Sequence, residues 1–216
     1  MGGERNHPGG RRMSQPTWRS YCQTIGDRAP LFAAIREAWD PDVALYPGSY
    51  VDLSPSTAIP SVTYVDTDRR AARFFGDADL VASELSGRAL PEAGADVTFI
   101  HQDYSTPLPL ETSSFDLLIS LYAGPVWDNC REYLTPQGLL LANASHGDAS
   151  LAALDPGLRL IAAVQHRAGV YRLIREGLGD YLVPKRPEAA DPQTIRDRGR
   201  GIAYTKSAFA YIFQLV

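Results

Sequence analysis

The sequence predicts a doubly wound α/β fold, in which helices cover both faces of a mostly parallel sheet. Short apolar runs alternate with helical patterns along the chain, as in successive strand–helix units. Residues 115–121 are apolar almost throughout, which is typical of a strand buried on both faces of a parallel sheet. Residues 208–216 alternate aromatic and aliphatic side chains, so the chain is expected to end in an interior strand.

The first strand–turn–helix–strand unit is expected within residues 43–68. An apolar run at 43–46 predicts a strand, and Pro47-Gly48 is a strong turn signal. Ser54-Pro55 favours a helix start, because serine can cap the free amides and proline suits the first helical position. Pro60 ends that helix after at most two turns. The β-branched and aromatic run at 62–65 predicts the second strand.

The rest of the chain is divided on the same grounds. Residues 1–16 are rich in Gly, Pro and Arg and predict a disordered arm, whereas 17–216 are expected to form a single domain. Its first part, 17–40, is expected to be a cover of two helices. Residues 184–201 combine prolines with charges and predict a loop excursion. Further helices are predicted at 69–75, 78–90, 126–134 and 150–154, and further strands at 97–100, 115–121, 139–143, 158–164, 170–174 and 208–216.

Composition restricts the class of protein. The net charge of −4 argues against broad nucleic-acid binding, so a small-molecule partner is the expectation. Cys22 and Cys130 lack the spacing of metal ligands or of a secreted disulfide framework. No apolar run approaches membrane-spanning length. A cytoplasmic protein with no membrane segment and no metal site is expected, while its oligomeric state is left open.

Five short motifs, in order, make residues 40–145 resemble the class I methyltransferases that use S-adenosylmethionine. Residues 46–50 (YPGSY) take the place of the family's glycine-rich loop, Asp66 follows the second strand and Asp103 follows the third. Residues 114–116 (SFD) open the fourth strand, and 133–138 (YLTPQG) precede the fifth. The resemblance implies a Rossmann-like sheet of seven strands with an antiparallel C-terminal strand. It also implies methyl transfer from S-adenosylmethionine to an unidentified acceptor.

The resemblance also implies a set of cofactor-binding residues. Asp66 would accept hydrogen bonds from the ribose hydroxyls, although an acid here can instead cap the next helix, for which Asp68 is better placed. Asp103 would accept from the adenine amino group with Tyr104 flanking the ring, or it is an ordinary turn residue. The full implied set is Tyr46, Gly48, Ser49, Tyr50, Asp66, Thr67, Asp103, Tyr104 and Leu121.

The glycine-rich loop is degenerate in this chain. Only Gly48 is retained, while Tyr50 and Asp52 stand where further glycines are usual. The Tyr50 side chain would either fill part of the cofactor pocket or point outward over the methionine end. Asp52 would bind the cofactor's amino group or cap the short helix at Ser54. The alternative hypothesis is therefore a non-catalytic binding module with an obstructed pocket, and a third is an enzyme for another nucleotide-like ligand.

Several other residues are ambiguous, and no catalytic base can be named. Tyr122 and Trp127, beyond the fourth strand, would line an acceptor pocket or pack under the next helix. His146 and Asp148 suit a base or a metal ligand, yet their sequence also suits a simple turn into a helix. A third group is cationic and would contact an anionic substrate or RNA, or would belong to a solvated loop: Lys185, Arg186, Arg196, Arg198 and Arg200.

Overall fold

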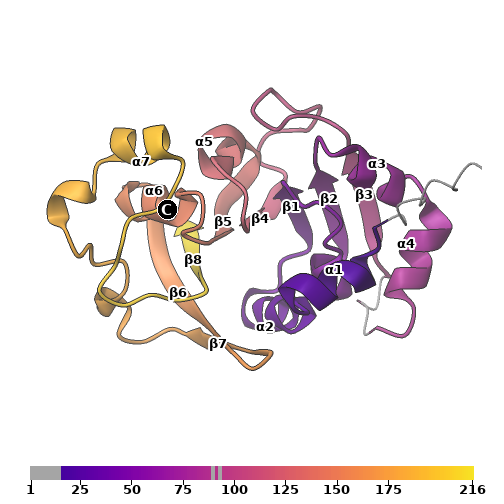
Figure 1. Cartoon of the computed structure of the whole chain (residues 1–216), viewed down its shortest axis with the longest axis horizontal. Helices are drawn as coiled ribbons and strands as arrows, with labels where there is room; N and C mark the ends of the chain where they lie inside the picture. The colour runs from indigo at the N-terminus through magenta and orange to yellow at the C-terminus, as the bar shows by residue number, and fades with distance from the viewer. Residues whose placement is uncertain (1–15, 89–90, 92–93) are drawn as a thin grey trace, which may run out of the picture.

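The computed structural model describes residues 16–88, 91 and 94–216, and the arm predicted at 1–16 lies outside these ranges except for Pro16. The centre of the fold is an eight-stranded sheet with the order β3-β2-β1-β4-β5-β8-β6-β7 (Figure 1). Its strands are β1 Val43–Pro47, β2 Ser61–Val65, β3 Asp96–Ile100, β4 Phe115–Ser120, β5 Leu134–Ala142, β6 Leu158–Arg167, β7 Val170–Ile174 and β8 Ala210–Leu215.

The predicted fold class is confirmed, with eight strands in place of seven. Strands β1 to β5 are parallel, and β8 lies antiparallel between β5 and β6, so the C-terminal strand is interior as expected. Strand β7, at the residues 170–174 predicted from the sequence, forms an antiparallel hairpin with β6 at the sheet edge. Ala168 and Gly169 form its turn with φ of 50° and 77°, the positive values that a tight two-residue hairpin turn requires.

Helices cover both faces, because the strand side chains alternate between two apolar clusters. Helices α1 to α4 supply buried residues to the first cluster and α5 and α6 to the second. Residues 101–114, between β3 and β4, contain no helix. The helices are α1 Trp18–Ile25, α2 Ala29–Trp39, α3 Arg69–Phe75, α4 Ala78–Leu85, α5 Val126–Cys130, α6 Asp148–Leu154 and α7 Pro192–Arg198. None of the helices in the described ranges combines the length and apolar character that a membrane crossing requires.

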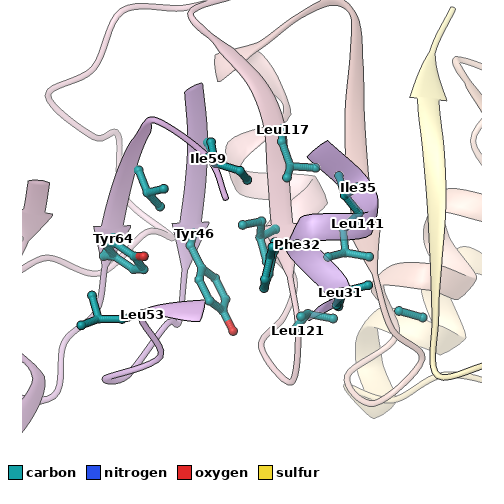
Figure 2. Close-up of a cluster of buried hydrophobic side chains, with 14 of the residues drawn as sticks. Leu31, Phe32, Ile35, Tyr46, Leu53, Ile59, Tyr64, Leu117, Leu121 and Leu141 are labelled. Atoms are coloured by element: carbon teal, nitrogen blue, oxygen red, sulfur yellow. The ribbon is translucent and has the colours of Figure 1, made fainter. Parts of the chain in front are cut away.

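The first apolar cluster places α2 against the centre of the sheet. Leu31, Phe32 and Ile35 of α2 are fully buried and face strand residues such as Leu117 and Leu141 (Figure 2). Tyr46 of β1 and Tyr64 of β2 are register partners, and their rings project to the same face of the sheet (Figure 2). The Tyr46 side chain therefore belongs to the core beneath α2.

The first crossover is as short as the sequence predicts. Ser54–Thr57 form a single 3₁₀ turn, η1, with Pro55 near its start. Further on, α4 ends at Leu85 instead of Leu90, and residues 89–90 lie outside the described ranges. The helix predicted at 126–134 ends at Cys130, continues as a 3₁₀ turn, and gives way to β5 at Leu134 because that residue already pairs with Phe115 of β4.

The loop excursion predicted at 184–201 is wrong in part, because it contains helix α7. The start of α7 is marked by an acceptor side chain followed by proline, whereas in η1 the serine before Pro55 lies inside the turn and the cap position, Leu53, makes no side-chain hydrogen bond. Asp191 Oδ2 accepts from the Thr194 amide at 2.7 Å, and Pro192 occupies the first helical position. Ile195 is buried, and α7 packs against α6 (Figure 1). The segment around α7 therefore packs against the rest of the domain.

Candidate functional site

A hollow of about 390 Å³ lies where five parallel strands end at their carboxyl side. Every residue that lines it follows one of these strands: Gly48 follows β1, Asp66 and Thr67 follow β2, Asp103 and Tyr104 follow β3, Tyr122, Ala123 and Gly124 follow β4, and His146 follows β5. Five of the nine residues expected to bind the cofactor are therefore brought together here.

Asp66 is oriented by two backbone amides. Its Oδ2 accepts from the Tyr50 amide at 2.7 Å, and its Oδ1 accepts from the Asp68 amide at 2.8 Å. Each carboxylate oxygen can accept a further hydrogen bond, so the half-buried group still offers acceptor positions to a ligand. Asp68 caps α3 by accepting from the Arg70 amide at 2.7 Å, as the sequence predicts. Asp66 is thereby free of the capping role.

Gly48 forms the floor of the hollow, and no other residue fits its position. Its φ is +67°, and a Cβ built on it would lie 2.5 Å from the Ala123 Cβ. The exits of β1 and β4 therefore meet at this glycine. The Gly48 amide donates to the Val65 carbonyl at 2.8 Å, which fixes the turn to the end of β2.

The Tyr50 side chain is not among the residues that line the hollow. Its ring contacts Tyr21 of α1 edge-on, with centroids 5.3 Å apart, and the Arg70 guanidinium lies 5.3 Å from the ring centroid. The Tyr50 backbone nevertheless keeps a φ of +48°, the left-handed conformation that glycine adopts most easily. The loop thus keeps a glycine-like path although the residue has changed.

Tyr104 spans the hollow between two strand exits. Its Oη donates to the Gly124 carbonyl at 3.2 Å, and its ring lies beside Gly48. Burial raises the pKa of the Tyr104 phenol, so it stays a neutral donor near pH 7. Asp103 is exposed, and its Oδ1 accepts from the Ser105 amide at 2.9 Å, which lowers the pKa of that carboxyl. Asp103 therefore closes its own turn and also faces the hollow.

Besides Tyr50, three more of the expected cofactor-binding residues do not line the hollow. Tyr46, Ser49 and Leu121 are buried, with at most 2% of each residue exposed. Tyr46 and Leu121 belong to the first apolar cluster, and Tyr46 Oη contacts a buried ion pair. Tyr46 and Tyr64 are register partners on neighbouring strands, so their side chains point to the same face of the sheet. That face is covered by the first apolar cluster, which puts Tyr46 in the core.

That ion pair is formed by Arg28 and Asp52, both buried. The Arg28 Nη1 lies 2.9 Å from Asp52 Oδ2, and the Asp52 Oδ1 accepts from the Ser54 amide at 3.1 Å. Asp52 is thus committed to an ion pair and to the start of η1, which was one of its two expected roles. The Arg28 guanidinium also lies 4.9 Å from the centroid of the Tyr122 ring, at the edge of the hollow. No local sequence pattern marks Arg28 for this position.

Asp148 anchors the segment that follows β4. Its Oδ2 accepts from the Ser120 hydroxyl and, at 2.8 Å, from the Val126 amide, so it holds both ends of residues 121–125. These residues include three that line the hollow. Asp148 is fully buried, and its Oδ1 has no hydrogen-bond partner among the described residues. Burial raises the pKa of this carboxyl from 3.8 to about 6.

The raised pKa of Asp148 makes stability depend on pH. The folded state binds this proton more tightly than the unfolded chain does, so Asp148 lowers stability as pH rises from about 4 to about 6. The cost levels off above that range at about 3 kcal/mol. We expect Asp148→Asn to remove this dependence. Urea unfolding of variant and wild type at several pH values measures it, and the gap between them should change by up to about 3 kcal/mol.

The control for this prediction is Asp79→Asn on the exposed face of α4. That variant should follow the wild-type pH profile in parallel. A gap between Asp148→Asn and wild type that stays constant from pH 4 to pH 7 would contradict the assignment.

Four lining residues were not in the expected cofactor-binding set. Tyr122, Ala123 and Gly124 belong to the segment beyond β4 where an acceptor was expected, and His146 follows β5. The feature of the sequence that could have indicated these four residues is their position directly after a parallel strand. His101 also follows a parallel strand directly, but it is not among the residues that line the hollow. Its Nε2 lies 3.0 Å from the Thr67 carbonyl oxygen.

Trp127 is not among the residues that line the hollow. Trp127 is buried and its indole donates to Asp155 at 2.8 Å, so packing is its role. Among residues 16–88, 91 and 94–216, no group of His, Cys, Asp and Glu side chains is arranged to hold a metal ion.

Comparison with known proteins gives only distant similarities. No family model and no curated protein matches the chain. A Corynebacterium glutamicum protein of solved structure is 12% identical, with 92% of this chain and 87% of that one covered and a TM-score of 0.47. A methyltransferase from Geobacter sulfurreducens is 13% identical over 72% and 85% of the two chains, with a TM-score of 0.46. An O-methyltransferase from Bacillus cereus in complex with SAH is 12% identical over 68% and 77%, with a TM-score of 0.44. Similarities of this kind concern the fold and assign no function.

Proposed function

We propose that the protein binds S-adenosylmethionine in this hollow and transfers its methyl group to a small-molecule acceptor. The observation that carries the proposal is the Asp66 carboxylate, held at the end of β2 by two amides and lining the hollow. A carboxylate at this place in an α/β fold accepts hydrogen bonds from both ribose hydroxyls of a nucleotide. Asp103 and Tyr104, one strand further on, are placed to meet the base.

The residues present fit the adenosine part of such a cofactor. The hollow of about 390 Å³ is within the usual range for ligand sites, and the Tyr50 ring that could have blocked it packs elsewhere. The sulfonium of the cofactor supplies an activated methyl group, so the protein mainly has to align the acceptor. Tyr122 is 49% exposed at the edge of the hollow and offers an aromatic surface for that acceptor.

A second candidate function is adenosine binding without methyl transfer. Three amides of the loop after β1 already donate to acceptors inside the protein. Gly48 donates to Val65, Tyr50 to Asp66 and Asp52 to Ser49. The loop therefore has none of these three amides left for the carboxylate at the methionine end of the cofactor. A binding module would take adenosine as tightly as S-adenosylhomocysteine, whereas a methyltransferase should favour S-adenosylhomocysteine.

The test of the ribose assignment combines a protein variant with a ligand variant. We expect the wild type to bind adenosine at least roughly tenfold more tightly than 2′,3′-dideoxyadenosine, because hydrogen bonds to a charged group contribute about 1.5–3 kcal/mol. Asp66→Asn should reduce that preference and weaken S-adenosylhomocysteine binding by roughly 10- to 100-fold. Isothermal titration calorimetry measures both.

The control is Asp79→Asn, which removes one negative charge at an exposed position outside the hollow. It should leave the binding of adenosine and of S-adenosylhomocysteine unchanged. If the wild type binds neither adenosine nor S-adenosylhomocysteine at high protein concentration, the proposal fails. Equal binding of adenosine and its dideoxy analogue would show that Asp66 does not contact the ribose.

As for the compartment, both cysteines are free thiols, which supports a place in the reducing cytoplasm.

A further inference from the structure

A second hollow, of about 450 Å³, lies within the segment between β7 and β8. It is formed by the 3₁₀ turn Pro187–Ala189, by α7 and by residues 200–203. Among the residues that the structure describes, no acidic side chain lines it, and four cationic ones do: Lys185, Arg186, Arg198 and Arg200. Four positive charges around one concavity stand out in a chain whose net charge is −4.

The walls of this basic pocket are fixed to the domain. Ile195 is 1% exposed and packs against Gly147, which has no space for a Cβ there. Arg196 of α7 donates two hydrogen bonds, of 2.6 and 2.8 Å, to the Asp128 carboxylate of α5. The pocket is therefore a built concavity and not an accidental space in a loose loop.

The far wall is fixed as well. The Gly201 amide donates to the Ala144 carbonyl at 3.0 Å, and Tyr204 Oη donates to the Ser150 hydroxyl at 2.7 Å. The Lys185 amide donates to the Ala203 carbonyl at 2.9 Å, which joins the two edges of the pocket. The four cations thus project from backbone that is held in place.

None of these four cations has an ionic or hydrogen-bonded side-chain partner within the described residues, whereas Arg196 on the same helix is paired. Like charges gathered in this way repel one another unless an anion joins them. Guanidinium groups bind phosphate and carboxylate through two parallel hydrogen bonds, and a lysine adds a compact charge. Side chains that are exposed and unpaired are free to close on such a ligand.

We infer that this basic pocket binds a small molecule that carries two or more phosphate or carboxylate groups. The concave shape favours a compact polyanion over RNA, which needs a groove that tracks its backbone. The pocket shares no lining residue with the hollow beneath Asp66, and the turn His146-Gly147 separates the two. The inference therefore stands independently of the proposed function.

The test uses pyrophosphate as the probe, measured by isothermal titration calorimetry at constant ionic strength. Pyrophosphate should bind the wild type, and the double variant Lys185→Gln/Arg198→Gln should bind it at least roughly tenfold more weakly, since each side chain supplies a charge-assisted contact. Arg167→Gln/Arg172→Gln on the exposed β6–β7 hairpin removes the same charge elsewhere and is the matched control. It should bind like the wild type.

Two further ligands show whether the pocket recognises phosphate or carboxylate groups, and whether RNA is the partner instead. Citrate that binds as tightly as pyrophosphate supports the inference with carboxylates as the recognised groups, and weaker citrate supports it with phosphates. Absence of pyrophosphate and citrate binding overturns it, as does equal weakening by the control variant. A single-stranded oligonucleotide that binds while both small anions do not overturns it in favour of RNA. Thermal melting of each variant shows whether it is folded.

Discussion

Replacing Arg28 by methionine is expected to destabilise the protein by about 3–5 kcal/mol, because it leaves a buried carboxylate without its partner. Asp52 is fully buried, and Arg28 Nη1 lies 2.9 Å from its Oδ2. Methionine keeps much of the apolar stem, so the loss is mainly that of the charge and its hydrogen bonds. Urea unfolding followed by circular dichroism measures the change, and the melting temperature should fall by roughly 10 °C.

The cost should be specific to the buried pair. Arg36→Met removes salt bridges to Asp40 and Asp42 that lie largely in solvent, and should cost no more than about 1 kcal/mol. Adding Asp52→Asn to Arg28→Met should restore part of the stability, because no charge then remains buried. If Arg28→Met costs no more than Arg36→Met, the pair does not stabilise the fold.

The pair also bears on the proposed site. The Arg28 guanidinium lies 4.9 Å from the centroid of the Tyr122 ring, and Tyr122 lines the hollow. Loss of the cation would release the ring at the edge where an acceptor is expected. Arg28 is a positioning residue in this respect, because it does not itself line the hollow.

The sequence predicts the fold class and the position of most strands along the chain, because the apolar runs that form the strands are local features. The strand predicted at 115–121 is β4, Phe115–Ser120, because an apolar run of that length is typical of a strand buried on both faces. Asp66 and Asp103 come together because the carboxyl ends of parallel strands share one edge of the sheet. Position in the chain was sufficient for these predictions.

The rest could not be predicted, because it depends on contacts between residues far apart in the sequence. The packing of the Tyr50 ring away from the hollow depends on Tyr21 and Arg70, which belong to different helices. The burial of Arg28 and Asp148 depends on partners supplied by distant segments, and charged residues are normally expected at the surface. By contrast, α7 could have been found from Asp191-Pro192, a local signal outweighed by the surrounding prolines and charges.

Gly48→Ala is expected to cost about 2–5 kcal/mol, and its cause can be separated into two parts. A non-glycine residue at a φ of +67° costs about 1–2 kcal/mol, and overpacking adds about 1–3 kcal/mol. The overpacking arises because the new Cβ would lie 2.5 Å from the Ala123 Cβ, across the floor of the hollow. Urea unfolding gives the total cost, and calorimetry with S-adenosylhomocysteine should show weaker binding as the two strand exits are forced apart.

Two further variants isolate the parts. Gly177 has a φ of +62°, and no atom of the described residues lies within 4 Å of a built Cβ, so Gly177→Ala reports the backbone cost alone. Ala123→Gly removes the atom with which the new Cβ collides, and the double variant Gly48→Ala/Ala123→Gly should recover most of the overpacking term. If Gly48→Ala costs no more than Gly177→Ala, the two strand exits do not meet as closely as the structure places them. If the hollow tolerated a methyl group at this position, packing against Ala123 would no longer explain why the loop after β1 keeps a glycine at residue 48.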